Sequence, residues 1–152
     1  MSEAEKPKVS DEEMLARFKR STNRPRASDL MGFELIAVDQ AAMRIECFFT
    51  AREDFTNPMG QVQGGFLTAM LDDAMSVAGL VASNITHVMP TLEMKTSFLR
   101  PAKPGRLRAV GHVLKWGKSI AFLEGELYDE QNRLLARATA TAMPTPYANY
   151  KS

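Results

Sequence analysis

The chain has 152 residues and a formal net charge of +1, with no long basic run, which argues against general nucleic-acid binding. This length makes one domain with a sizeable core. Cys47 is the only cysteine, so the chain can form no internal disulfide. Its neighbours at alternate positions are apolar, which indicates a core thiol of a protein in a reducing compartment. With no N-terminal apolar signal region and no charge-free stretch of 18 apolar residues, we expect a soluble cytoplasmic protein that does not bind a membrane.

The N-terminal segment is polar and contains one short helical pattern. Residues 1–9 are polar, and we expect them to be mobile. Ser10 can cap a helix over residues 11–20, which has acidic residues in its first turn and basic residues in its last turn. Residues 21–30 are expected to form a linker. The chain is therefore divided into three parts: an N-terminal extension (1–30), a main domain (31–145) and a C-terminal tail (146–152).

Six segments of the main domain have the apolar and polar patterning of strands. The alternation is clearest in the last one, where alanines on one face alternate with Arg137, Thr139 and Thr141 on the other. Trp116-Gly117 and Gln131-Asn132 are predicted as hairpin turns. The predicted strands cover residues 33–38, 42–49, 91–99, 105–115, 118–129 and 133–143.

Between the second and third predicted strands, residues 66–81 are apolar at nearly every position, which is typical of a helix inside a protein. At about 100° per residue, its small and polar positions fall within an arc of roughly 80°, with Asp72 near the centre and Asp73 outside it. These positions are Thr68, Asp72, Ser76, Gly79 and Ser83. One interpretation is a polar seam in which Asp72 makes structural hydrogen bonds; the other is that Asp72 acts in chemistry.

A glycine pair opens this helix after the turn at residues 57–63. The first N–H groups of a helix lack intrahelical partners and lie at the positive end of its dipole, so the turn is suited to hold an oxyanion. One long helix with about six antiparallel strands indicates an α+β fold, in which a sheet curls around the helix.

The chain resembles the hotdog-fold acyl-CoA thioesterases, and most closely their phenylacetic-acid-degradation (PaaI-like) branch. The resemblance covers residues 30–143, in order. It is carried by Asn57-x-x-Gly-x-x-Gln63-Gly64-Gly65 with Asp72 in the helix, by the run from Thr91 to Gly105, and by Gly117-Lys-Ser119, Glu124-Gly-Glu-Leu-Tyr-Asp129 and Leu135-Ala-Arg-Ala-Thr-Ala-Thr141.

The resemblance implies a role for several residues of the motif. Asn57 is expected to orient substrate or water, and the N–H of Gly64 to bind the thioester carbonyl. Asp72 takes the position of the general base or nucleophile, with Thr91 close to it. Gln63 stands where most relatives have His; its amide can orient and polarise a carbonyl but cannot take up a proton near neutral pH.

The spacing of this motif predicts a site shared between two chains. Gly64 and Asp72 are eight residues apart, or about 12 Å along one helix. An antiparallel helix related by a two-fold axis would bring Asp72 of one chain to Gly64 of the other. A homodimer with two sites follows, and the resemblance adds that such dimers often pair into tetramers.

Acyl-CoA is the expected substrate, and no cofactor is expected. Gly65 and Thr91 are expected to contact the substrate, and Arg100, Lys103 and Lys118, near predicted strand ends, to contact the CoA phosphates. A plainer interpretation is that such basic residues only keep sheet edges soluble. Ten methionines suggest a pliable acyl pocket, although a core role explains each equally well.

Other reaction classes find less support in the sequence. It contains no Gly-x-Ser-x-Gly, no P-loop lysine and no His or Cys cluster at metal-ligand spacing. His87 and His112 are interpreted as structural. The main alternative is a non-catalytic acyl-CoA-binding or regulatory hotdog protein, which Gln63 motivates. A hydratase is disfavoured because such sites generally pair a His with a carboxylate.

Overall fold

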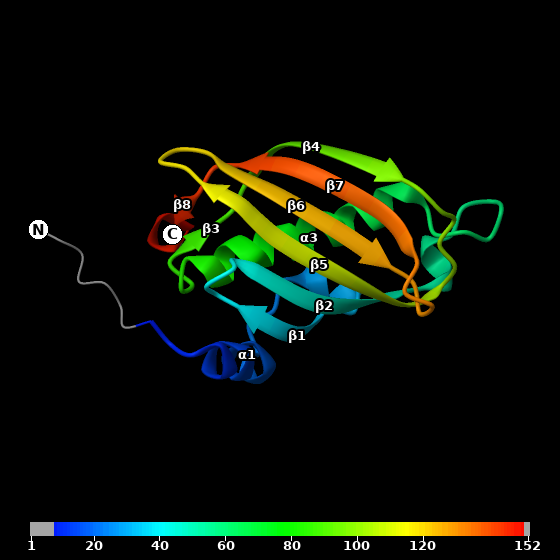
Figure 1. The fold of residues 1–152 in the computed structure, drawn as a ribbon. Helices are drawn as coiled ribbons and strands as arrows, with labels where there is room; N and C mark the ends of the chain where they lie inside the picture. The colour runs from blue at the N-terminus through cyan, green and yellow to red at the C-terminus, as the bar shows by residue number, and fades with distance from the viewer. Residues whose placement is uncertain (1–7, 151–152) are drawn as a thin grey trace, which may run out of the picture.

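The computed structural model describes residues 8–150 and shows a six-stranded antiparallel sheet around a long central helix, α3 (Gly64–Ala82) (Figure 1). The strand order across the sheet is β1-β2-β5-β6-β7-β4, so β1 and β4 form its edges. This confirms the predicted α+β architecture and all six predicted strands, with small shifts at their ends. Their bounds are β1 (Glu34–Asp39), β2 (Arg44–Ala51), β4 (Thr91–Phe98), β5 (Gly105–Trp116), β6 (Ala121–Tyr128) and β7 (Leu134–Ala142).

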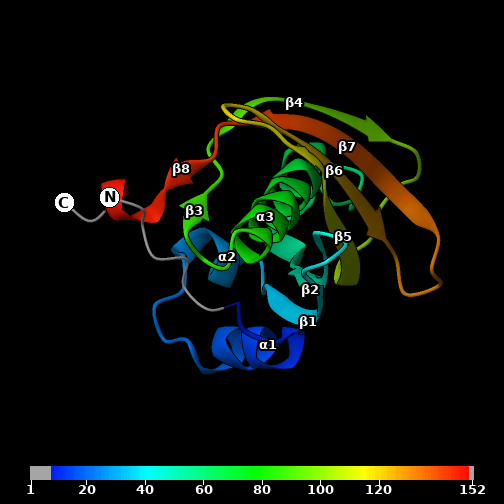
Figure 2. The same cartoon turned by 60° about the vertical axis from the view of Figure 1, so that its left-hand side comes forward.

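The sheet curls around α3, as the view turned by 60° shows (Figure 2). One half of the helix is buried against the sheet through Leu67, Met70, Leu71, Ala74, Met75, Ala78, Gly79 and Val81. The approach is closest at Gly111 of β5, where a Cβ atom would lie 2.1 Å from the carbonyl oxygen of Ala74. By length and hydropathy α3 could also cross a membrane, a property that it shares with the core helices of soluble proteins.

The N-terminal segment packs onto this core. Helix α1 (Asp11–Arg20) is present as predicted, and the Ser10 hydroxyl accepts a hydrogen bond from the Glu13 N–H at 3.1 Å. Met14 of α1 is fully buried in the main core. The linker prediction is wrong for residues 26–30, which form helix α2 (Arg26–Leu30) directly after Pro25. Pro25 is the N-cap residue of this helix, and the hydrogen bond from the Ser28 hydroxyl to Asp73 ties the short helix to α3.

The predicted turns differ slightly from those observed. In the β5–β6 turn the N–H of Gly117 donates to the carbonyl of Ile120, so the chain reverses at residues 118–119 and not at Trp116-Gly117. The turn at Gln131-Asn132 is confirmed: a carboxylate oxygen of Asp129 accepts from the N–H groups of Gln131 and Arg133.

Several short elements complete the structure. The two-residue strands β3 (His87–Val88) and β8 (Thr145–Pro146) pair with each other. The 3-10 helix η1 (Glu53–Phe55) precedes α3, and the 3-10 helix η2 (Tyr147–Tyr150) follows β8. They are too short for a periodic pattern to predict. The expectation of mobility at residues 1–7 lies outside the described residues.

Candidate active site

The polar seam of α3 runs along the edge of the sheet formed by β4. Thr91, the first residue of β4, donates its hydroxyl to Oδ1 of Asp72 at 2.6 Å. One turn earlier, Thr68 of α3 donates its hydroxyl to that of Thr96 at 3.2 Å. Asp72 is partly exposed, and its Oδ2 accepts no hydrogen bond from the described residues 8–150. One oxygen of this carboxylate is thus fixed while the other is left for a further partner.

The start of α3 presents unpaired backbone donors. Among the described residues, the N–H groups of Gly64 and Gly65 have no hydrogen-bond acceptor, whereas the next two N–H groups bond to the carbonyl of Gln63. The ring of Phe98 from β4 lies over Gly64, so that an added Cβ atom would meet it at 3.0 Å. The two glycine N–H groups therefore point out of the helix end beside an aromatic wall, as an anion or carbonyl site requires.

Gln63 occupies the N-cap position of α3, and its side chain makes no capping hydrogen bond. Its backbone is anchored instead, because its N–H donates to the carbonyl of Phe55 at 2.8 Å. The exposed side chain lies over Gly65, where a Cβ atom would come within 2.7 Å of Oε1. The Gln63 amide is therefore next to the free glycine N–H groups.

Asn57 organises the loop before α3. Its Oδ1 accepts hydrogen bonds from the N–H groups of Met59 at 3.0 Å and Gln61 at 3.2 Å. Its own N–H donates to the carbonyl of Gln61 at 2.7 Å. The side-chain NH₂ of Asn57 donates to no other described residue and is left to contact a substrate or a water.

Asp73, the neighbour of Asp72, has different surroundings. Its Oδ1 accepts a hydrogen bond from the Ser28 hydroxyl of α2 at 3.1 Å, and its Oδ2 is buried with no hydrogen-bond partner in the described residues. Burial raises the pKa of Asp73 to about 6; the Ser28 hydrogen bond opposes this shift and the charge of Asp72 adds to it. The two carboxylates thus lie on different sides of α3, as the helical arc predicts.

One chain does not bring the helix start and Asp72 together. Both lie on the continuous helix α3, so eight residues, or about 12 Å, separate them along its axis. A carbonyl held at Gly64 would therefore be out of reach of the Asp72 carboxylate of the same chain.

Comparison with known proteins decides the family. The model of the thioesterase superfamily matches residues 59–136, which run from the loop before α3 into β7. The chain belongs to the thioesterase superfamily.

Relatives agree with this assignment. Human acyl-coenzyme A thioesterase 13 is 30% identical over 110 residues, which are 71% of this chain and 78% of that protein. A phenylacetic acid degradation-related protein of Ralstonia eutropha JMP134 has 36% identity and a TM-score of 0.78, over 85% of this chain and 98% of its own. The PaaI protein of E. coli shares the fold at a TM-score of 0.72, with 18% identity over 88% and 91% of the two chains. The predicted hotdog fold and PaaI-like resemblance are confirmed.

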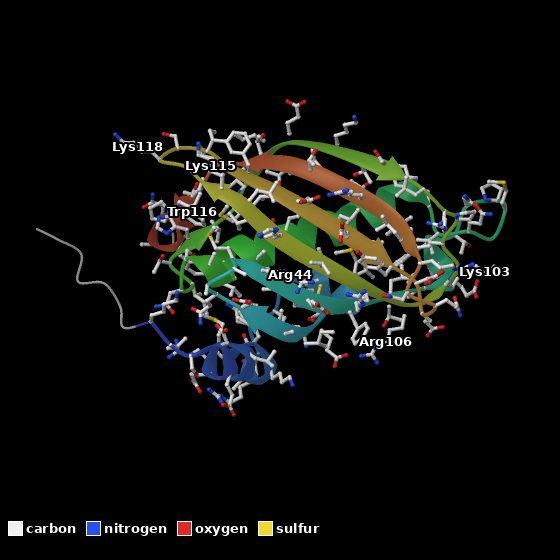
Figure 3. All side chains as sticks on the ribbon, viewed as in Figure 1. Arg44, Lys103, Arg106, Lys115, Trp116 and Lys118 are labelled. Atoms are coloured by element: carbon white, nitrogen blue, oxygen red, sulfur yellow. The ribbon has the colours of Figure 1, made fainter. Side chains whose placement is uncertain are left out.

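The basic residues expected to contact CoA lie at opposite ends of this thioesterase chain (Figure 3). Lys103 precedes β5, whereas Lys118 lies in the turn after it, and the 12-residue strand between them spans more than about 30 Å. Arg100 lies at the Lys103 end and donates to the carbonyl of Leu134 at 2.9 Å. A single chain thus cannot gather all three around one phosphate group.

Sequence reasoning missed two contacts of the candidate site. The Thr68–Thr96 hydrogen bond fixes α3 to β4 beside Asp72, and the Phe98 ring covers Gly64. Phe98 is 53% exposed and lies on the edge strand β4. Its only signal in the sequence was its place in the run from Thr91 to Gly105.

The two histidines make structural contacts. His87 accepts or donates a hydrogen bond with the Thr86 hydroxyl at 2.8 Å through Nδ1, and its ring packs edge-on against Trp116. His112 lies within β5, opposite Arg44 of β2 and Glu124 of β6. Neither contact involves Asp72 or the start of α3.

Proposed function

We propose that the protein hydrolyses acyl-CoA thioesters, with Asp72 as general base or nucleophile and the Gly64 N–H as oxyanion donor. The observation that carries this proposal is the Asp72 carboxylate, which is held through Oδ1 by Thr91, while its Oδ2 has no hydrogen-bond donor within residues 8–150. Acyl-CoA as substrate is supported by the name of the human relative, acyl-coenzyme A thioesterase 13.

The site is completed across a homodimer in this proposal. The partly exposed side of α3, next to β4, presents small or polar residues at Gly65, Ala69, Asp72 and Ser76, which permit close approach of a second helix. An antiparallel α3 from a second copy places its Gly64 near Asp72 and, by symmetry, makes two sites.

The edge strand β4 supports the same dimer. It is the last strand of the sheet, and it carries the exposed apolar side chains of Leu92 and Phe98, which are 54% and 53% exposed. An exposed apolar edge strand offers backbone groups and apolar surface for pairing. A second copy of the chain accounts for both features, and two such dimers could pair into a tetramer.

A two-fold axis across α3 would also bring together basic residues that lie far apart within one chain. Lys103 lies toward the start of α3 and Lys118 toward its end, where Trp116 contacts His87. An antiparallel partner brings its Lys118 toward the Lys103 of the first chain. The phosphates of one CoA would then meet basic residues of both chains.

The chemistry follows from these positions. The carbonyl oxygen of the thioester accepts a hydrogen bond from the Gly64 N–H of one chain, while Asp72 comes from the other chain. The Gln63 and Asn57 amides orient the carbonyl and the attacking water. With Asp72 as general base, its Oδ2 takes a proton from water as the water oxygen bonds to the carbonyl carbon. The C–S bond then breaks, and the departing thiolate of CoA receives the proton. A thiolate leaves readily, so no Ser-His-Asp set is required.

Asp72→Asn tests this proposal. Turnover should fall by roughly a hundredfold or more, the scale for loss of a general base, as measured by thiol release from a panel of acyl-CoAs. Asp54→Asn is a matched control, because Asp54 is an exposed carboxylate that pairs with Arg52. Unchanged turnover in the folded Asp72 variant would contradict the assignment.

A non-catalytic acyl-CoA-binding protein is the second candidate, because Gln63 replaces the more usual His and cannot transfer a proton. Binding without thiol release by the wild-type protein, across the same panel, would support this candidate instead.

A further inference from the structure

The free edge of β4 carries a row of backbone groups that can pair with another strand (Figure 1). On its other edge, the N–H of Leu99 donates to the carbonyl of Leu135, in register with the pairing of β4 and β7. Backbone groups of an antiparallel strand face its two neighbours alternately, so the odd-numbered residues 93–97 also bond to β7. The N–H and C=O groups of the even-numbered residues 94–98 therefore face the free edge.

Two charged side chains on the outer face of β4 have no charged partner in their own chain. Glu93 and Lys95 are exposed, and neither forms an ion pair within residues 8–150. Their opposite neighbours on β7, Thr141 and Thr139, are uncharged. Charges on an edge strand commonly deter pairing. Opposite signs two residues apart on one face can also match a second strand that runs in the opposite direction, depending on the register.

The proposed dimer fixes the place of its two-fold axis on α3, and the present inference rests on that dimer. Asp72 and Gly64 exchange places across the axis, so Thr68, which is midway between them, lies at the axis. The Thr68 hydroxyl donates to that of Thr96 on β4 at 3.2 Å. The axis that relates the two helices therefore crosses the sheet edge close to Thr96.

The contacts of β4 with α3 limit the crossing point to three residues. Thr91 and Phe98, at the two ends of β4, contact the two helix residues that exchange places across the axis. The middle of β4 and the Thr96 contact together limit the centre of a β4–β4 pairing to residue 94, 95 or 96. Opposed residues of an antiparallel pair point to the same face, so the axis passes at a residue and not between two residues.

Of these three centres, residue 94 alone matches the charges. It places Glu93 of each chain opposite Lys95 of the other, in a non-hydrogen-bonded pair, where side chains approach most closely. A centre at residue 95 would oppose two Lys95 side chains, and a centre at residue 96 would oppose Lys95 and Ser97. We propose that two copies of the chain pair through β4 with Met94 opposite Met94 of the second copy, and that two Glu93–Lys95 ion pairs select this register.

Cysteine crosslinking tests the register. The Cα atoms of a hydrogen-bonded pair are about 5.5 Å apart, which a disulfide can span. Met94→Cys should therefore crosslink two chains under an oxidant, as seen on a non-reducing gel. Lys95→Cys and Thr96→Cys should not, because each would lie two or four residues out of line with its copy. The native Cys47 is fully buried and does not compete.

The crosslinking outcomes are exclusive. Crosslinking at Lys95→Cys or Thr96→Cys in place of Met94→Cys would overturn the register. Crosslinking at none of the three, in a protein that still dimerises, would overturn the pairing through β4 itself.

Charge reversal tests the ion pairs. Glu93→Lys opposes lysines and Lys95→Glu opposes glutamates, so each homodimer should dissociate about tenfold or more readily than the wild type in sedimentation at low salt. The variant with both changes should regain the wild-type dissociation constant. The two single variants, one of them tagged and the two refolded together, should form mixed dimers above the fraction expected from random assortment. High salt should reduce these differences.

Glu130→Lys is the matched control, because it changes the net charge equally at an exposed residue of the β6–β7 turn, away from β4. It should dissociate like the wild type. Equal dissociation constants for Glu93→Lys and this control, or no recovery in the variant with both changes, would overturn the ion pairs.

Assembly is measured without substrate, so its outcomes are separate from those of the proposed function. If Met94→Cys crosslinks but the wild-type protein releases no thiol from acyl-CoA, the interface stands and the enzymatic proposal fails. Hydrolysis by dimers that do not crosslink at Met94→Cys would keep the enzymatic proposal and overturn this register. A monomeric wild-type protein that hydrolyses acyl-CoA would overturn both the register and the shared site.

Discussion

Replacement of Asp73 by Asn should change how the stability of the protein depends on pH. The carboxylate is mostly buried, and burial is the main reason that its pKa is about 6 instead of the usual 3.8. Asn has nearly the same shape, keeps a carbonyl oxygen for the Ser28 hydroxyl and does not ionise. It therefore mimics the neutral form of Asp73 at every pH.

The sign of the effect follows from proton binding. Between pH 4 and pH 6 the folded wild-type protein keeps the Asp73 proton that the unfolded chain releases, so its free energy of unfolding decreases as the pH rises. A rise in pKa from 3.8 to about 6 corresponds to about 3 kcal/mol. This contribution is fully present below pH 4 and lost above about pH 6.5. Asp73→Asn should thus match the wild type near pH 4 and be more stable at pH 7, by up to about 3 kcal/mol.

Urea unfolding at half-unit steps from pH 4 to pH 8 measures this difference, followed by far-UV circular dichroism and by the fluorescence of the single tryptophan, Trp116. Protein concentration must be held constant, because association would stabilise the folded state. Asp129→Asn is a control of opposite sign. Hydrogen bonds from the backbone and side chain of Arg133 lower the pKa of Asp129, so its replacement should cost stability at pH 7 and less at lower pH.

Parallel curves for wild type and Asp73→Asn from pH 4 to pH 8 would refute the reasoning. They would mean that Asp73 ionises as in water, and hence that its carboxylate is solvated and not buried behind α2.

Three further predictions concern the dimer, the helix start and the core. Mixing inactive Asp72→Ala with inactive Asn57→Ala subunits should restore part of the activity, because each mixed dimer holds one intact site if Asn57 and Asp72 of a site come from opposite chains. No recovery in demonstrably mixed dimers would show that the two residues of a site come from the same chain. Gln63→Glu should lower kcat because it places a negative charge beside the developing oxyanion, whereas Gln63→His should retain turnover, with a new pH dependence near the imidazole pKa of about 6.5. Equal rates for both variants from pH 5.5 to 8.5 would exclude the Gln63 side chain from the mechanism. Gly111→Ala should lower the melting temperature strongly, since its Cβ atom would lie 2.1 Å from the Ala74 carbonyl oxygen, and a melting temperature equal to that of the wild type would contradict this contact.

The sequence by itself determined the long elements of secondary structure and the residues of the candidate motif. The capped helix at Ser10, the six strands and the buried helix all follow from local patterns, because backbone hydrogen bonding and one-sided burial impose periods that are visible in the residues. The helical arc also separated Asp72 from Asp73 correctly. The closeness of Thr91 to Asp72 came from the family resemblance, and the structure confirms it with a hydrogen bond.

Only the tertiary structure decided the contacts between distant segments. Residues 26–30 have no periodic pattern, yet they form a helix because Ser28 meets Asp73, which is 45 residues away in the sequence. The same packing buries Asp73 and raises its pKa, and the fold sets Phe98 over Gly64. Local patterns report which face of an element is buried, but which side chain it meets there depends on how the sheet curls around α3. For that reason the burial of Asp73 behind α2 has no signature in the sequence.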